Sequence, residues 1–156
     1  MTESGDAPDG APAAAPGTLR LSIVLEPARE FQDELGEGIR AAMAETVPAE
    51  TPKRLGLKIH DADGVLVAGL TASAYWGWMF VAAVWVLPGR RGEGLGRHLM
   101  VSAEAVARSW GCHSVWLDTF QTRGFYARLG YEVFGTLEAY PGPQGRSFLR
   151  KRIAPA

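Results

Sequence analysis

The sequence predicts a mixed α+β domain in which one sheet contains a single internal crossover. Two stretches predict this class. Residues 55–87 hold three strand-like segments separated by turn signals, as in an antiparallel meander. Residues 78–120 then run from an apolar strand through a glycine-rich turn and a helical pattern to another strand. That order implies a parallel, right-handed crossover.

The N-terminal region is expected to contain a tail, a strand and a helix. Residues 1–18 are rich in Ala, Pro, Gly and Asp, which predicts a flexible tail before a single domain at residues 19–156. Leu19–Leu25 alternates apolar and polar residues, as a half-buried strand does. Ala28–Thr46 is expected to be a helix because its apolar residues lie four apart. They are Phe31, Leu35, Ile39 and Met43.

The meander is expected between residues 55 and 87. Leu55–His60 alternates, and Asp61–Gly64 is a hairpin turn signal. Val65–Trp76 continues as a long strand that Gly77 breaks. Met79–Leu87 is short, uncharged and rich in Val, which predicts a buried strand.

A helix and a strand complete the crossover. The helix has one apolar face, and Gly111 is its expected C-cap. This face consists of Leu95, Leu99, Ala103, Val106 and Trp110. The strand His113–Phe120 follows, and then a short helix at Arg123–Leu129. Tyr131–Tyr140 and Ser147–Ile153 are expected to form a final hairpin.

The composition excludes several classes of protein. The 156 residues have a formal charge of −1, so no overall field favours nucleic acid or a membrane surface. No run of about 18 apolar residues exists, and the N-terminus lacks the pattern of a secretory signal. Cys112 is the only cysteine, so no intrachain disulfide can form. The three histidines have no metal-ligand spacing, and no metal is expected. We therefore expect a cytoplasmic enzyme or binding module.

The turn from Arg90 to Arg97 has the composition of an anion site. Glycines permit positive φ angles and a close approach of the backbone to a ligand. The N–H groups at the start of a helix, together with its dipole, favour a phosphate. Arginine side chains add charge-assisted hydrogen bonds. A helix-start turn without a ligand is the alternative that short patterns leave open.

Two familiar phosphate sites do not fit this turn. A nucleoside triphosphate loop requires Gly-Lys-Ser/Thr, whereas this chain has Gly96-Arg97-His98. A dinucleotide-binding unit could use Asp118 at the end of the next strand as its ribose-binding acid. However, it requires its last glycine where Arg97 stands, and a preceding meander is foreign to that fold.

A third site, the acyl-CoA loop, fits at every position. Arg91–Gly96 matches Arg/Gln-x-x-Gly-x-Gly/Ala and resembles this loop in the GNAT superfamily of N-acetyltransferases. Val115–Gly135 resembles the superfamily's second block, in which a strand leads to a Phe-Tyr-x-x-x-Gly-Phe/Tyr helix. Phe148–Lys151 is similar to the last strand of a bacterial small-molecule branch. With the strand order, the resemblance covers about Leu19–Ile153.

The resemblance implies the GNAT acyl-CoA N-acyltransferase fold, a twisted, mixed but mostly antiparallel sheet of six to seven strands flanked by about four helices. A V-shaped split would separate the fourth and fifth strands, Met79–Leu87 and His113–Phe120. The pantetheine arm of acetyl-CoA would lie in the split, with its pyrophosphate on the turn. The implied cofactor-binding residues are Val84, Trp85, Val86, Arg91, Gly92, Glu93, Gly94, Leu95, Gly96 and Arg97.

The resemblance also implies the chemistry, an N-acetyltransferase in which a small-molecule amine attacks acetyl-CoA directly in a ternary complex. Tyr126 occupies the family's position for the acid that protonates the leaving thiolate. Many relatives carry a general base on the fourth strand, where this chain has Ala82 and Ala83. The remaining candidates for the group that takes the proton of the amine are water, a backbone carbonyl, Glu26, Asp118 and Glu138. A weakly basic acceptor would need no base.

The acceptor pocket is less defined by the sequence. Trp76 and Trp78 offer an aromatic wall, although core packing is the other explanation. Asp118 and Gln121 complete the candidate pocket, in a loop that is shorter than in the similar branch. A non-catalytic acyl-CoA-binding module, a protein acetyltransferase acting on Lys or an N-terminus, and a homodimer stay open. Neither the acceptor amine nor the acyl-chain preference follows from the residues.

Overall fold

The computed structural model of the protein describes residues 21–154. They belong to two compact units, divided between Pro48 and Ala49. The predicted tail at residues 1–18 lies outside the described residues. The single domain at residues 19–156 therefore stays a prediction.

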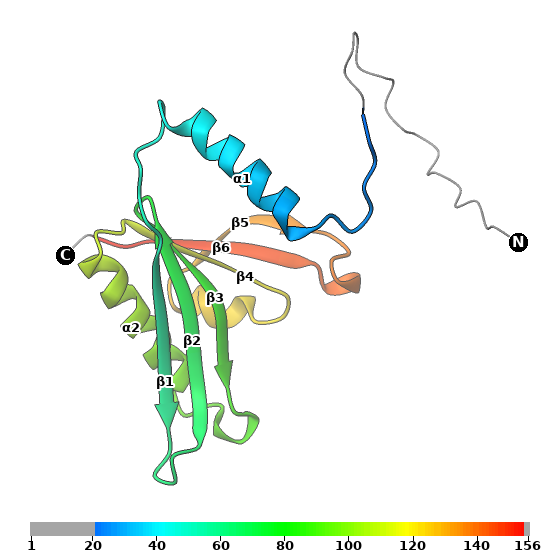
Figure 1. The fold of residues 1–156 in the computed structure, drawn as a ribbon. Coiled ribbons are helices and arrows are strands. Elements are labelled where there is room, and N and C mark those ends of the chain that lie inside the picture. The colour runs from blue at the N-terminus through cyan, green and yellow to red at the C-terminus, as the bar shows by residue number, and fades with distance from the viewer. Residues whose placement is uncertain (1–20, 155–156) are drawn as a thin grey trace, which may run out of the picture. The chain divides into compact units, whose positions relative to one another are not determined.

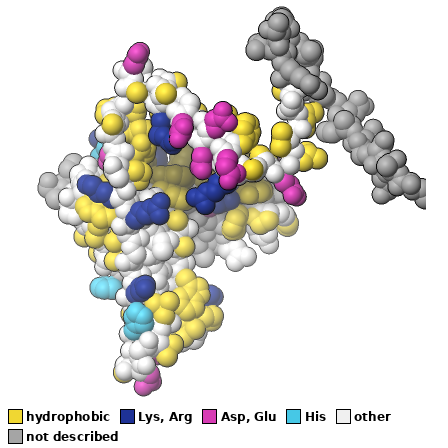
Figure 2. Space-filling view, viewed as in Figure 1, with side chains coloured by type: hydrophobic (Ala, Val, Ile, Leu, Met, Phe, Trp, Pro, Cys, Tyr) yellow, Lys and Arg dark blue, Asp and Glu magenta, His cyan; other side chains and the backbone are white. Residues whose placement is uncertain are grey.

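The first unit contains one helix, α1 (Arg29–Met43), which confirms the predicted helix. None of its residues is buried, and Phe31, Leu35 and Ile39 are each about half exposed. Figure 2 shows Asp and Glu side chains gathered over α1 beside hydrophobic ones. The helix is thus amphipathic, with acidic and apolar residues along its length.

The predicted strand Leu19–Leu25 is wrong in its described part. Residues 21–25 form no strand, and the side chains of Leu21, Ile23 and Leu25 are exposed. Alternation provides a face to bury, but a strand forms only where a neighbouring strand pairs with its N–H and C=O groups. No described strand pairs with this segment.

The second unit contains a six-stranded sheet in the order β1-β2-β3-β4-β6-β5 (Figure 1). Only β3 and β4 are parallel; the other neighbours are antiparallel. The predicted meander, parallel crossover and final hairpin are therefore confirmed. The strands are β1 (Lys53–His60), β2 (Leu66–Tyr75), β3 (Trp78–Val86), β4 (Ser114–Thr119), β5 (Glu132–Leu137) and β6 (Arg146–Arg152).

Turn chemistry fixes the two hairpins of the meander. Oδ1 of Asp61 accepts hydrogen bonds from the backbone N–H groups of Asp63 and Val65, at 3.0 and 2.9 Å. Between β2 and β3, Trp76 and Gly77 both have positive φ angles, 48° and 74°. A two-residue loop of this kind matches the twist of the flanking strands.

The helices of the second unit follow the predicted order. The helix α2 (Leu95–Ser109) has Trp110 as its C-cap residue, and the predicted C-cap Gly111 follows it with a φ of 81°. The helix α3 (Arg123–Arg128) follows β4. Two short 3-10 helices are η1 (Pro88–Arg90) and η2 (Gly142–Gln144).

The core lies between α2 and one face of the sheet. Leu99 and Met100 of α2 are buried in one cluster with Met79 of β3 and with Val115 and Leu117 of β4. Because side chains alternate along a strand, these residues define the face of β3 and β4 that α2 covers. Phe80 and Trp116 are the residues that follow Met79 and Val115, and they therefore belong to the opposite face. Their rings stack on each other, with centroids 4.2 Å apart.

The split that the sequence predicts is present between β3 and β4. Their parallel pairing runs from Trp78 with Ser114 to Val81 with Leu117, and then stops although β3 continues to Val86. A β-bulge interrupts the pairing of β3 with β2 at this level, where Ala82 has no partner residue. Bulges bend the strand that contains them, and Figure 1 shows β3 and β4 diverging. Because Leu19–Leu25 is not a strand, these are the third and fourth strands of the sheet.

Candidate functional site

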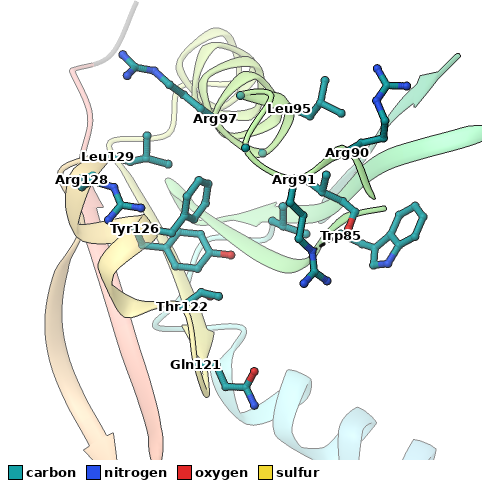
Figure 3. A pocket seen from close by; sticks show the side chains of 16 residues that line it. Trp85, Arg90, Arg91, Leu95, Arg97, Gln121, Thr122, Tyr126, Arg128 and Leu129 are labelled. Carbon is teal, nitrogen blue, oxygen red and sulfur yellow. Dashed lines mark hydrogen bonds between the residues drawn. The ribbon is translucent and has the colours of Figure 1, made fainter. Parts of the chain in front are cut away.

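A cavity of about 620 Å³ lies where β3, the glycine-rich turn, α2 and α3 meet. Its residues come from two stretches, 84–97 and 121–129. The first begins at the end of β3 and the second follows β4, the two strands that part at the split. Figure 3 shows Arg91 of the first stretch and Tyr126 and Thr122 of the second on either side of a common space. The lining residues are Val84, Trp85, Val86, Arg90, Arg91, Gly92, Gly94, Leu95, Gly96, Arg97, Gln121, Thr122, Phe125, Tyr126, Arg128 and Leu129.

The glycine-rich turn leaves room for a ligand at the start of α2. Gly92 and Gly94 have positive φ angles, 88° and 82°, and a Cβ added at either would meet nothing within 4 Å. Gly94 is the N-cap residue of α2, and no side chain caps the helix. The first N–H groups of the helix have no intrahelical partner. The turn therefore offers unobstructed backbone donors to an anion.

Gly96 serves a different purpose from the other two glycines. A Cβ at this position would lie 3.2 Å from Cζ of Phe125 and 3.7 Å from Cγ2 of Val86. This glycine therefore lets the first turn of α2 approach both β3 and α3. Close packing at this point brings Phe125, and with it Tyr126, to the edge of the turn.

The charge of the cavity wall is positive. Arg90, Arg91, Arg97 and Arg128 all line it, while Glu93 does not. Glu93 instead forms an ion pair with Arg90 at 2.7 Å. Nε of Arg91 donates to the carbonyl oxygen of Val86 at 3.4 Å, which holds this side chain against the end of β3. Guanidinium groups around open backbone donors suit a pyrophosphate.

The end of β3 offers a second kind of contact. Val84 and Val86 pair with β2 on one side, but β4 no longer pairs with them on the other. Both residues line the cavity. An unpaired strand edge can bond the amides of an extended ligand, as in β-augmentation. The pantetheine arm of acetyl-CoA has such amides, so the residues present fit this substrate.

Tyr126 is the buried titratable side chain of the cavity. It is 8% exposed and packs edge-on against Phe125 and Tyr131. Burial raises the pKa of its phenol above the usual value; a hydrogen bond from Thr122 lowers the pKa in part, and the charge of Asp118 raises it further. Figure 3 shows its hydroxyl directed into the space between α3 and β3. A protonated phenol at this position can donate a hydrogen bond to a ligand atom.

The structure separates the candidate acceptor residues. Gln121 lines the cavity, whereas Trp76, Trp78 and Asp118 do not. Trp76 and Trp78 lie at the other end of β3. Trp78 contacts the ring of His113 edge-on there. Asp118 lies near the end of β4 in an ion pair with Arg146 at 2.6 Å.

Four lining residues were missed by the sequence reasoning: Thr122, Phe125, Arg128 and Leu129. Phe125 and Leu129 are four residues apart and therefore share one side of α3, which is a signal that the sequence contains. Arg128 has no comparable signal. Only the packing of α3 beside the turn brings this cation to the three arginines of residues 90–97.

The part of the chain that the structure describes lacks two other features. Residues 21–154 contain no group of three or more His, Cys, Asp or Glu side chains that could hold a metal ion. None of their helices is long and apolar enough to cross a membrane.

The geometry agrees with the family that the sequence matches. Residues 25–131 match the model of the Acetyltransferase (GNAT) family, which is more than half of the chain. The chain therefore belongs to this family, whose members use acetyl-CoA as co-substrate.

Two curated relatives are named after the small molecules that they acetylate. The chain is 42% identical over 81 residues to blasticidin-S acetyltransferase from Streptomyces morookaense, covering 50% of this chain and 60% of the relative. It is 33% identical over 113 residues to streptothricin acetyltransferase from Streptomyces lavendulae, covering 67% of this chain and 57% of the relative. The chain thus spans less than two thirds of each relative.

A solved structure shares the fold. An acetyltransferase from Bacillus cereus ATCC 14579 superposes with a TM-score of 0.78 at 22% identity, covering 85% of this chain and 98% of that chain. The fold is therefore the GNAT acyl-CoA N-acyltransferase fold, as the resemblance implied.

Proposed function

We propose that the chain is an N-acetyltransferase that transfers the acetyl group of acetyl-CoA to the amine of a small molecule. One observation carries the proposal: a single cavity joins the open edge of β3, the glycine-rich turn and the buried Tyr126. The names of the two antibiotic acetyltransferases support a small-molecule acceptor. The buried, unpaired thiol of Cys112 is compatible with a cytoplasmic location, which is part of the proposal.

The turn and β3 position the first substrate. Backbone donors of residues 92–97 and the surrounding arginines hold the pyrophosphate. The open backbone of Val84–Val86 holds the pantetheine arm. An N–H group of Val84 or a neighbour polarises the thioester carbonyl, as in an oxyanion hole. Both reactants are thereby held in one cleft, which supplies much of the acceleration.

Tyr126 acts on the leaving group. The amine nitrogen forms a bond to the carbonyl carbon, the C–S bond breaks, and its electron pair goes to sulfur. The Tyr126 hydroxyl donates to this sulfur. A free thiol has a pKa of about 8.5 and a phenol about 10, so a hydrogen bond forms readily and complete proton transfer is slightly uphill.

A thiol-release assay over a panel of amines tests the proposal. The panel contains blasticidin S, streptothricin, benzylamine and a peptide with a free Lys, and acetylated products are identified by mass spectrometry. We expect release of CoA with at least one small amine and little with the peptide. Release with the peptide alone would contradict the small-molecule acceptor and favour a protein acetyltransferase.

A non-catalytic acyl-CoA-binding module is the second candidate. One observation favours it: Ala82 and Ala83 are exposed at the split, where β3 offers no carboxylate to take a proton from the amine. Calorimetry with acetyl-CoA decides between the two together with the assay. Tight binding with no acetylated product from any amine would favour the module.

A further inference from the structure

The strand register locates a carboxylate and Ala82 each one residue beyond the last pair of β3 and β4. Val81 of β3 and Leu117 of β4 are the last paired residues, and both are buried against α2. Side chains alternate along each strand. The next residues, Ala82 and Asp118, therefore belong to the opposite face, at the level where the two strands part. Phe80 and Trp116 share this face two residues earlier in their strands, where their rings stack on each other.

Asp118 is held in place while one of its oxygens stays available. Its side chain is 14% exposed, and Nε and Nη2 of Arg146 both lie 2.6 Å from Oδ2. Among residues 21–154, no side chain donates a hydrogen bond to Oδ1. The guanidinium of Arg146 is itself fixed over the ring of Phe120, 4.9 Å from its centroid. The carboxylate thus has one oxygen bonded and one oxygen free.

Asp118 is also close to the leaving-group side of the cavity. Its negative charge raises the pKa of the Tyr126 phenol, which is the third contribution after burial and the Thr122 hydrogen bond. Gln121 and Thr122, which line the cavity, follow it within the same loop. The strand edge of β3, Tyr126 and Asp118 therefore border the same end of the split.

We propose that Asp118 binds the protonated amine of the acceptor through Oδ1 and takes its proton, in place of the acid that β3 lacks. The inference rests on the proposed N-acetyltransferase function. It selects alkyl amines, which are cationic at neutral pH, as the acceptor class. Glu138 lies beyond the end of β5, which β6 separates from β4.

The proton balance of the reaction is complete with these two residues. The ammonium gives one proton to Oδ1 of Asp118, which leaves a neutral amine. The amine forms the N–C bond and the C–S bond breaks, while the Tyr126 hydroxyl donates a hydrogen bond to the leaving sulfur. The second proton of the nitrogen passes through water to the sulfur, and Asp118 releases its proton to solvent. The products are the acetamide, CoA with a free thiol, and one proton.

Asp118→Asn tests the inference, because it keeps the shape and removes the charge and the basic oxygen. We expect kcat/KM for the alkyl amine that the wild type acetylates fastest to fall about 100-fold or more at pH 7. Binding of acetyl-CoA, measured by calorimetry, should stay within about twofold of the wild type, because Asp118 does not line that cavity. Glu132→Gln is the matched control. It removes the carboxylate of another ion pair on the same sheet, Glu132 with Arg150 at 2.9 Å.

A pH series separates a proton acceptor from a structural residue. The charged or titratable side chains that act on Asp118 are Arg146 from β6 and Tyr126 from α3. An alkyl amine has a pKa of about 10 and becomes neutral as the pH approaches that value. The ratio of wild-type kcat/KM to that of Asp118→Asn should therefore decrease between pH 7 and pH 9.5. A deficit that is the same at every pH would overturn the proton role.

A second variant guards against a folding defect. Adding Ala82→Glu to Asp118→Asn returns a carboxylate to the split from the other strand, and we expect it to restore at least a tenth of the wild-type kcat/KM. Full activity of Asp118→Asn would overturn the role of Asp118 and leave the proposed function standing. A wild type that acetylates no amine would instead overturn the proposed function.

Discussion

The hydroxyl of Tyr131 donates a hydrogen bond of 3.1 Å to Oε1 of Glu104, and both side chains are only 4% exposed. Glu104 also accepts from Nζ of Lys151, at 2.8 and 2.7 Å, and lies 3.5 Å from Nη2 of Arg108. Tyr131 packs against Tyr126, whose carbonyl oxygen accepts from the Tyr131 N–H. The network therefore fixes α2 and β6 behind the tyrosine of the site.

Tyr131→Phe should destabilise the protein by about 1 kcal/mol at pH 7, because it removes one hydrogen bond to a buried carboxylate. Burial, followed by the charge of Glu104, raises the pKa of Tyr131 far above its usual value. Above about pH 10 the unfolded chain loses a proton that the folded chain keeps, so the stability from this group is lost as the pH rises. Thermal melting between pH 8 and pH 11 should show a shallower alkaline loss in the variant than in the wild type. An identical slope would contradict the assignment.

Lys151→Met should cost about 3 kcal/mol, because it leaves the buried carboxylate of Glu104 with the Tyr131 hydroxyl and the more distant Arg108 as its described partners. Arg150→Met is the matched control. The ion pair of Arg150 with Glu132 on the same hairpin is at least half exposed and should contribute less than about 1 kcal/mol. Urea unfolding of both variants checks the difference. Equal losses of unfolding free energy in the two variants would show that the burial of Glu104 does not determine the destabilisation.

Gly94→Ala should weaken CoA binding, because its methyl group would enter the open space at the start of α2. We expect at least a tenfold increase of Kd for CoA and no change for pantetheine, which lacks the pyrophosphate. Gly64→Ala is the control for backbone strain, since Gly64 has a similar φ of 79° and open surroundings in a distant hairpin. Calorimetry measures both ligands. A loss of pantetheine binding in Gly94→Ala would show that the substitution acts on more than the pyrophosphate site.

Tyr126→Phe should lower kcat about 10- to 100-fold and leave the Kd of acetyl-CoA unchanged, if the phenol acts on the leaving thiolate. Because burial raises the pKa of this phenol, it stays protonated through neutral pH and up to strongly alkaline pH. We therefore expect no loss of kcat from this group below about pH 10. Tyr75→Phe, at the other end of the meander, should leave kcat unchanged. An unaltered kcat in Tyr126→Phe would remove the acid role.

Much of the fold could be predicted because its signals are local. Asp61–Gly64 predicts its hairpin through its own side-chain and backbone geometry, and Gly111, with its positive φ, directly follows the C-cap residue of α2. The prediction of a strand at Leu19–Leu25 was wrong because alternating residues indicate a face to bury but do not supply a partner strand. The expected strand had the right period, but its described residues have no neighbour in the sheet.

The family, the strand–turn–helix order and the glycine-rich turn could be predicted from the residues alone, since each depends on residues that are adjacent in the chain. Which distant residues meet became evident from the folded chain. It brought Arg128 of α3 to the arginines of the turn, and it set Asp118 of β4 at the level of Ala82 of β3. Hydrogen bonds between strands fix their register, and the pairs of β3 with β4 end at Val81 and Leu117, one residue before the bulge at Ala82.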